Sequence, residues 1–151
     1  MNLTRTLVAI ALLGAAGMAQ AAGNCTISLK SDDAMKFDLK EATVSASCAK
    51  ITIDLVHTGK LPAAAMGHNV VITKSADLTA LTRDAMKAGL ANNYVPAGDA
   101  RVIASTKIIG GGEKTQVTFP GKALAAGGDY TFFCSFPGHS ALMKGKLVVT
   151  K

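Results

Sequence analysis

YTFFCSFPGHSALMKG, residues 130–145, joins a strand-forming run to a turn and then to the start of a second strand. Its aromatic and β-branched beginning favours an extended strand, and Pro137-Gly138 is typical of a turn. The same stretch spaces a thiol, an imidazole and a thioether as Cys134, His139 and Met143. Three such groups on one loop between strands can converge on one point. The stretch therefore predicts a piece of β-sheet that carries part of a metal site.

The rest of the chain predicts a fold made mostly of strands. Short runs rich in Val, Ile, Thr and Phe are separated by Gly, Pro, Asp or Asn clusters. These runs are TISLK (26–30), KFDL (36–39), ATVSA (42–46), KITIDLVH (50–57), HNVVITK (68–74), VIASTKII (102–109), TQVTFP (115–120) and KLVVTK (146–151). Their regular spacing is typical of antiparallel architectures, so we expect an all-β, Greek-key sandwich or barrel.

One segment departs from the strand pattern. Between residues 74 and 92, Leu78, Leu81, Ala85 and Met86 recur at helical spacing. Ser75 or Asp77 is suited to cap the start of a helix, and Gly89 to end it. We expect a single helix here, inserted as a flap.

The N-terminus has the pattern of a secretory signal peptide. Arg5 precedes an apolar run over residues 7–16, and Ala19-Gln20-Ala21 matches a cleavage site. The run is shorter than the roughly 20 residues of a spanning helix. A lipoprotein is the alternative, but its Cys would directly follow the cleavage site, and Cys25 lies later. We predict a cleaved signal at residues 1–21, with the cut after residue 21 or 22, and one exported domain at residues 22–151 without membrane insertion.

Charge and aromatic content argue against nucleic acid as a partner. The chain has 16 Lys and Arg, of which Arg5 lies in the expected signal, against 10 Asp and Glu, so the mature net charge is +5. The lysines are scattered, which is typical of a solvated surface. A nucleic-acid site would favour a basic stripe with interleaved aromatics, whereas this chain has no Trp and two Tyr.

Three cysteines in an exported protein raise the question of which thiol is unpaired. Cys25 and Cys48 are flanked by Thr, Ser and Ala, with no His or acidic pair at ligand spacing. We interpret them as a structural disulfide, which contributes about 3 kcal/mol. Cys134 is then the odd thiol, and it is either an inert core residue or a metal ligand.

A complete metal site needs a ligand from outside the loop. His68, in MGHNVV, is the best candidate because it begins a predicted strand after a Gly. Two imidazoles and a thiolate in a plane, with a weak axial thioether, form a blue-copper site. We therefore predict one copper ion per chain. The same Cys and His residues could also bind zinc.

The pairing of MGHN (66–69) with CSFPGHSALMKG (134–145) resembles the azurin family, the bacterial periplasmic members of the cupredoxins. LPAAAMGHNVV, RVIASTKIIGGGEK and the early cysteine pair support this resemblance over the mature chain. It implies that His68, Cys134 and His139 are equatorial copper ligands, Met143 a long axial ligand and the Gly67 carbonyl a second weak axial contact. Asn69 and Phe136 would fix the ligand loop.

The resemblance implies a periplasmic carrier that cycles Cu(II) and Cu(I), not an enzyme. Partners would be periplasmic redox proteins such as c-type cytochromes or copper nitrite reductase, and we expect a monomer. The expected docking patch around His139 comprises Met35, Met66, Phe136, Pro137, Ala141 and Leu142; the two methionines are equally compatible with scattered core positions.

Two other functional classes stay open. A copper carrier or metallochaperone would use similar soft ligands, but it needs an exposed Met-rich or His-rich tract, and none is present. A copper enzyme would need a second metal site, yet the chain has only three His. The third, His57, shares parity with Ile51, Ile53 and Leu55, so we interpret it as a buried core residue or a neighbour of the site.

Overall fold

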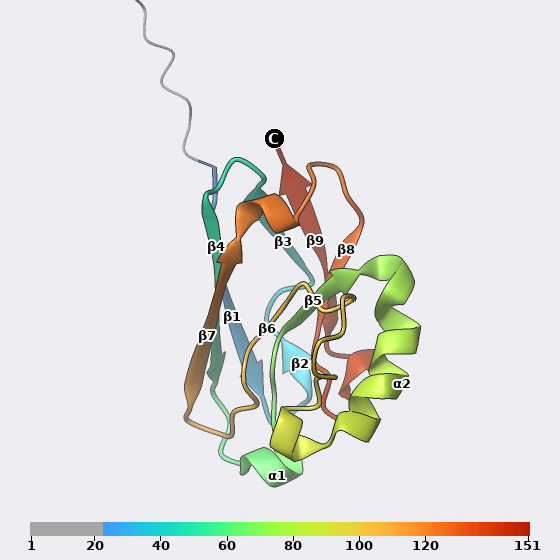
Figure 1. Cartoon of the computed structure of the whole chain (residues 1–151). Coiled ribbons are helices and arrows are strands. Elements are labelled where there is room, and N and C mark those ends of the chain that lie inside the picture. The colour runs from blue at the N-terminus through green and yellow to red at the C-terminus, as the bar shows by residue number, and fades with distance from the viewer. Residues whose placement is uncertain (1–22) are drawn as a thin grey trace, which may run out of the picture.

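The computed structural model of the chain describes residues 23–151; the expected signal peptide and its cleavage site lie outside them. The described residues form two β-sheets packed face to face (Figure 1). The strands are β1 (Thr26–Asp32), β2 (Lys36–Phe37), β3 (Glu41–Ser45), β4 (Lys50–His57), β5 (Val71–Lys74), β6 (Ala104–Ser105), β7 (Lys114–Pro120), β8 (Tyr130–Phe133) and β9 (Lys144–Thr150). The helices are α1 (Ala63–Met66) and α2 (Leu78–Ala88), with 3-10 turns η1 (Ser75–Asp77), η2 (Leu90–Asn92), η3 (Gly121–Ala123) and η4 (His139–Ala141).

The strand order is β2-β1-β4-β7 in one sheet and β3-β9-β8-β5-β6 in the other. The predicted sandwich is confirmed, and the sheets do not close into a barrel. Two neighbouring pairs, β1 with β4 and β3 with β9, are parallel. The other pairs are antiparallel, so the expected antiparallel architecture holds except at these two pairs. The alternation of apolar and polar residues along a strand indicates which face of the strand is buried. It does not indicate whether the neighbouring strand runs parallel or antiparallel.

Alternating side chains from both sheets fill the space between the layers. In β4, Ile51, Ile53 and Leu55 point inward and are fully buried, whereas the residues between them are partly exposed. The second sheet contributes Leu147 and Val149 of β9, which are also buried. Burial of each such side chain contributes about 1.5–3 kcal/mol. This core holds the sheets in place and thereby fixes the loops at their ends.

Three predicted strands are shorter than expected: the run at residues 36–39 keeps only β2 at Lys36–Phe37, and two more are cut near His68. The run at residues 68–74 becomes β5 only from Val71, and the run at residues 102–109 keeps only the two-residue β6. His68 instead forms an isolated bridge with Ile109, with backbone bonds in both directions of 3.0 and 2.9 Å. This bridge anchors the backbone of His68, whose side chain lies in the cluster described below.

The predicted helical flap is present as η1, α2 and η2. Leu81 and Ala85 are buried against the β-sandwich, and Gly89 ends α2 with φ 74°. Met86 is 53% exposed, so it does not belong to the apolar face that its spacing predicted. The short helix α1 was not predicted from the sequence. No helix among residues 23–151 has both the length and the apolar character to cross a membrane.

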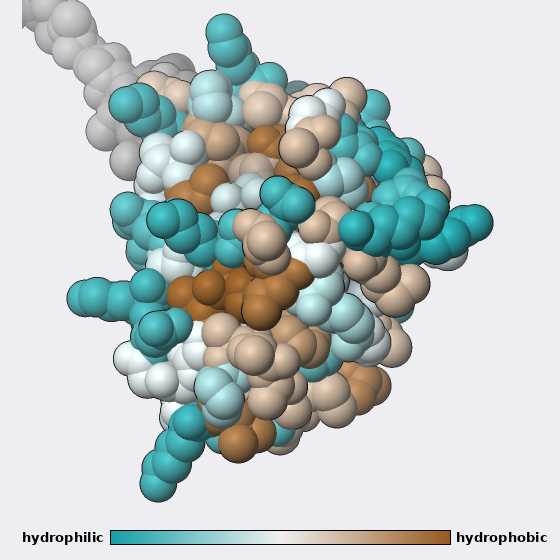
Figure 2. Space-filling model, turned by 60° about the horizontal axis from the view of Figure 1, so that its bottom comes forward, coloured by the Kyte–Doolittle hydropathy of each residue, from teal (hydrophilic) through white to brown (hydrophobic). Residues whose placement is uncertain are grey.

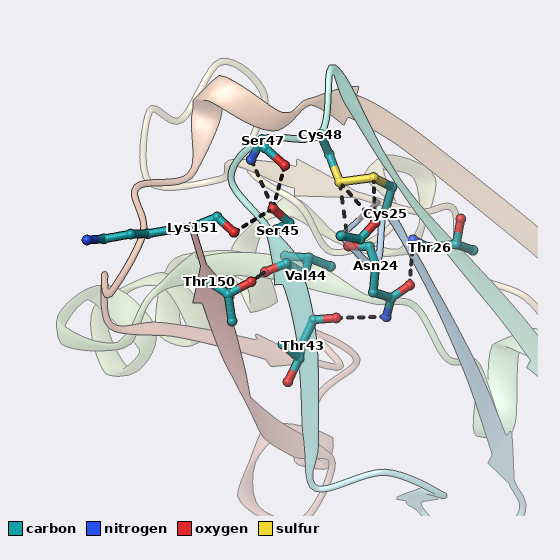
Figure 3. Close-up of a disulfide and its surroundings, with 11 residues drawn as sticks. Asn24, Cys25, Thr26, Thr43, Val44, Ser45, Ser47, Cys48, Thr150 and Lys151 are labelled. Atoms are coloured by element: carbon teal, nitrogen blue, oxygen red, sulfur yellow. Dashed lines mark hydrogen bonds between the residues drawn. A yellow bond between two sulfur atoms is a disulfide. The ribbon is translucent and has the colours of Figure 1, made fainter. Parts of the chain in front are cut away.

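The predicted disulfide between Cys25 and Cys48 is confirmed, with a Cα–Cα distance of 5.7 Å (Figure 3). Beside it, Ser45 Oγ donates to the carbonyl of Lys151, 3.0 Å away. This cluster therefore lies where β9 ends, whereas the other end of β9 follows Met143 directly. The disulfide and the predicted ligand loop thus lie at opposite ends of one strand.

Candidate metal centre

Three of the four predicted side-chain ligands lie on the loop between β8 and β9, and the fourth comes from a separate segment. Cys134 directly follows β8, His139 begins η4, and Met143 directly precedes β9. His68 comes from the segment between α1 and β5. The loop folds back on itself because the Cys134 N–H donates to the Met143 carbonyl at 2.9 Å, and the Met143 N–H donates to the His139 carbonyl at 2.7 Å.

The structure brings His68, Cys134 and His139 together, with one donor atom from each within 4.8 Å of the others. Cys134 Sγ lies 3.9 Å from His68 Nδ1 and 3.7 Å from His139 Nδ1. Metal–sulfur and metal–nitrogen bonds of about 2.3 and 2.0 Å, about 120° apart, separate sulfur from nitrogen by about 3.7 Å. The donor set therefore fits a trigonal metal site, and its mixture of soft thiolate and imidazole suits copper.

Gly67 and Met143 lie next to these three groups. The Gly67 carbonyl oxygen is 3.9 Å from Cys134 Sγ. A side chain at residue 67 would clash with the carbonyl of Ala63 and the side chain of Ile108, so only Gly allows this close approach. Met143 is fully buried and belongs to the same core cluster as Cys134.

Both clustered imidazoles are held in the neutral form that binds metals. Burial, with a smaller contribution from His68, lowers the pKa of His139 to about 4. Burial also lowers the pKa of His68, against the opposing effect of its bond to the Asp32 carbonyl. That bond joins His68 Nε2 to the oxygen at 2.8 Å, and it places the ring proton on Nε2. His68 Nδ1 is therefore left with a lone pair that faces the thiol.

The thiol of Cys134 requires a metal ion to ionise at neutral pH. Burial raises its pKa to about 11, although backbone hydrogen bonds from Asn69 and Phe136 oppose this rise. Because these two amides stabilise the thiolate, they favour the form that binds metal. Metal binding would then displace one proton from the sulfur.

Asn69 connects the His68 segment to the ligand loop. Its side-chain oxygen accepts from the Ser135 N–H at 2.9 Å, and its Nδ2 donates to the Asn93 carbonyl at 3.0 Å. The Asn93 side chain in turn accepts from the Ile108 N–H at 2.9 Å. These contacts lock residues 68 and 134 relative to one another. The resemblance to azurins suggested this role for Asn69, but Asn93 was missed because its only local signal is an Asn pair in a loop.

His57 is fully buried, in agreement with its parity on β4. Its ring stacks on that of His68 with centroids 4.4 Å apart. Its Nε2 lies 3.0 Å from the Met66 carbonyl, and its Nδ1 accepts from the Gly59 N–H at 3.0 Å. Both nitrogens of His57 thus have hydrogen-bond partners, and neither belongs to the donor cluster. His57 instead packs against the His68 ring and restricts its orientation.

His139 is the member of the cluster nearest to the surface. It is 3% exposed, whereas His68, Cys134 and Met143 are completely buried. Phe136 packs on its ring with centroids 4.6 Å apart. Of the residues expected around it, Met35, Met66 and Phe136 are half-buried, and Pro137, Ala141 and Leu142 are exposed.

This end of the molecule presents apolar residues to solvent. Figure 2 shows apolar atoms gathered in the middle of the face, with hydrophilic side chains projecting around them. Leu142 is 58% exposed and is the most exposed large apolar residue described. Exposed Leu61 and Met86 were not among the predicted surface residues: Leu61 begins the LPAAAMGHNVV motif, and Met86 was assigned to the apolar face of the helix.

Comparisons with known proteins agree with the interpretation of this cluster as a copper site. The model of the copper binding proteins of the plastocyanin/azurin family matches residues 23–150. Azurin of Bordetella pertussis (strain Tohama I) is 52% identical over 143 residues, which are 95% of each chain. Azurin-1 of Alcaligenes xylosoxydans xylosoxydans is 58% identical over 123 residues, which are 82% of this chain and 95% of the relative.

A solved structure agrees as well. Azurin Az-iso2 of Methylomonas sp. strain J superposes with a TM-score of 0.81 at 45% identity, covering 84% of this chain and 98% of its own. Together with the His68, Cys134 and His139 cluster, these matches indicate a copper cofactor and a role in electron transfer. The chain belongs to the plastocyanin/azurin family of copper binding proteins.

Proposed function

We propose that the chain would hold one copper ion through His68, Cys134 and His139, with Met143 and the Gly67 carbonyl as additional weak ligands. The ion supplies one-electron chemistry by cycling between Cu(II) and Cu(I). One observation carries the proposal. Three donor atoms converge in a buried cluster, and only His139 among these residues reaches the surface.

The protein groups around the ion prepare it for electron transfer. The ligand loop and the Asn69 contacts would hold the donor atoms in one arrangement, which would limit reorganisation when the charge of the ion changes. Burial of Cys134 excludes water and protects the thiol from oxidation. The hydrogen bond from His68 Nε2 orients its ring and fixes the tautomer.

An electron would reach the ion through His139, because a partner can approach this residue more closely than the completely buried His68 and Cys134. The docking patch of Met35, Met66, Phe136, Pro137, Ala141 and Leu142 surrounds it. An apolar patch suits small, transient contacts with several redox proteins. We propose c-type cytochromes or copper nitrite reductase as these partners, and a monomeric carrier without enzymatic activity.

The carrier is proposed to act in the periplasm. Residues 1–21 direct export and are removed, which leaves residues 22–151 as the mature domain. A metallochaperone role is less compatible with the site, because a chaperone must release its metal and the donors of Cys134 and His68 are completely buried.

Copper titration of the metal-free protein tests the ligand assignment. The parent should bind one equivalent of Cu(II) and turn intensely blue, since a thiolate-to-copper charge transfer absorbs strongly in the red. Cys134→Ser should bind copper weakly and without the blue band, whereas Cys25→Ser/Cys48→Ser should stay blue. A blue Cys134→Ser protein would refute the assignment.

A further inference from the structure

A groove lies between the helical flap and the ligand loop. It has a volume of about 390 Å³. The flap side is lined by Thr79, Thr82, Arg83 and Met86, and the loop side by Ser135, Phe136, Pro137, Gly138, Ser140 and Ala141. The groove therefore adjoins the loop that carries His139, and whatever occupies it sits beside the electron exit.

Arg83 gives this groove an uncompensated positive charge. It is exposed, and it forms no ion pair among the residues that the structure describes. Its neighbour Asp84 is the only acidic residue of α2, and that carboxylate already pairs with Arg101 at 2.8 Å and with Lys87 at 3.1 Å. The guanidinium of Arg83 is thus left to interact with a partner from outside the chain.

We propose that the groove receives an acidic side chain of the redox partner, whose carboxylate pairs with Arg83 while the apolar patch around His139 covers the rest of the contact. The inference rests on the proposed electron-transfer function and adds the chemistry of the partner: its electron-exit face carries Asp or Glu at the edge of an apolar surface.

The lining of the groove fits this occupant. A guanidinium binds a carboxylate through two parallel hydrogen bonds, which fixes orientation as well as position. The hydroxyl groups of Thr79 and Ser140 offer further donors, whereas the Thr82 hydroxyl already donates to the Thr79 carbonyl at 3.0 Å. Exposed Met86 supplies an adaptable apolar wall for the stem of the side chain. The attraction also steers the encounter, because opposite charges raise association rates at low salt.

Stopped-flow reduction of the copper-loaded protein tests the proposal. The electron donors in this experiment are two ferrous c-type cytochromes, one with an acidic surface and one with a basic surface. In each reaction haem Fe(II) is oxidised to Fe(III) while Cu(II) is reduced to Cu(I). Arg83→Gln should slow bleaching of the blue band by the acidic cytochrome about three- to fivefold at low salt. Arg83→Glu should slow it more, and Arg83→Lys should recover part of the rate. The basic cytochrome should not be slowed.

Lys87→Gln is the matched control, since it removes one charge from the same helix outside the groove. It should change either rate by less than about twofold, and high salt should abolish the Arg83 effect. Equal effects of Arg83→Gln and Lys87→Gln would show that only net charge matters and would overturn the proposal.

A second experiment locates the contact by NMR. When the acidic cytochrome is added to the Cu(I) protein, the backbone amide signals that shift should include those of Thr79 and Thr82. Shifts confined to another face would also overturn the proposal. A parent protein that is not blue, or that neither cytochrome reduces, would contradict the electron-transfer function itself.

Discussion

Lys40 Nζ donates a hydrogen bond to the carbonyl oxygen of Leu142, 3.0 Å away, although the two residues are 102 positions apart in the chain. Leu142 follows η4, and its N–H donates to the His139 carbonyl at 3.0 Å. The backbone of Lys40 is itself anchored, because its carbonyl accepts from the Lys146 N–H at 2.9 Å. The ammonium therefore ties the outer side of the ligand loop to the start of β3.

Removing this contact should loosen the ligand loop. In metal-free Lys40→Met, the amides of Leu142 and Met143 should exchange with solvent faster, and the free energy of unfolding should fall by about 1 kcal/mol. Lys40→Arg should restore most of both properties. Lys50→Met, which removes a charge at the other end of the sandwich, is the control. Unchanged exchange in Lys40→Met would mean that the loop holds its shape without this bond.

Replacement of Asn69 should be far more damaging than loss of a surface hydrogen bond. Asn69→Leu leaves the buried Ser135 N–H without its acceptor, so we expect a loss of about 3 kcal/mol in the free energy of unfolding. Thr118→Val removes the exposed contact with Thr52 and should cost less than about 0.5 kcal/mol. Urea unfolding of the metal-free variants measures both. Similar losses would indicate that water replaces the Asn69 contacts.

Met143→Ala should keep the blue colour and change the reduction potential. A weak axial thioether tunes the copper site, whereas the equatorial thiolate and imidazoles create it. The variant also leaves a cavity in the core, so its unfolding free energy should fall by about 2–5 kcal/mol. Absorption spectroscopy and redox titration separate these effects. Complete loss of copper binding would show that Met143 is indispensable and that its axial assignment is incorrect.

Copper affinity should depend on pH with a defined sign. The pKa of Cys134 is about 11 and that of His139 about 4 in the metal-free protein, so near pH 7 each bound copper should release about one proton, from the thiol. Affinity should rise with pH up to about 11, and it should fall more steeply below about 4, where His139 also competes for protons. Calorimetry in buffers of different ionisation enthalpy counts the protons. Release of none at pH 7 would require a thiolate already present in the metal-free protein.

Stability of the metal-free protein should fall in acid for a related reason. The folded pKa of His139 lies below its ordinary value of 6.5, so the unfolded chain binds more protons between pH 6.5 and about 4. The free energy of unfolding should therefore decrease as pH falls through this window. Bound copper should protect against this loss, because it occupies the ring nitrogen. A His139→Gln variant should show a flatter dependence in the metal-free state.

Loss of the disulfide should weaken the fold but spare the metal site. Cys25→Ala/Cys48→Ala should reduce the free energy of unfolding by about 3 kcal/mol, since the pair closes a loop with a sequence separation of 23. The seven-residue β9 places the ligand loop about 20 Å away. The blue spectrum of the copper-loaded variant should match that of the parent. A shifted spectrum would reveal coupling along β9.

Much of the fold could be predicted from local patterns. The alternation in β4 identified its buried face, and the change of period identified the helical flap. Strand direction could not be predicted, because β1 pairs in parallel with β4 through contacts between distant segments. The same limit explains why Met86 was assigned to an apolar helical face: spacing alone does not tell which side of a helix a sheet will cover.

The candidate site divides in the same way. The spacing of Cys134, His139 and Met143 determined the kind of chemistry, because thiolate, imidazole and thioether donors on one loop suit copper whatever surrounds them. The tertiary structure decided what those donors can do. Only folding brings His68 from a distant segment and places Lys40 on the Leu142 carbonyl. Folding also pairs Asp84 with Arg101 and leaves Arg83 without an ion-pair partner among residues 23–151. Each of these depends on residues far apart in the chain, and the physical reason is that side-chain pairing and burial are set by packing between elements, which local sequence does not specify.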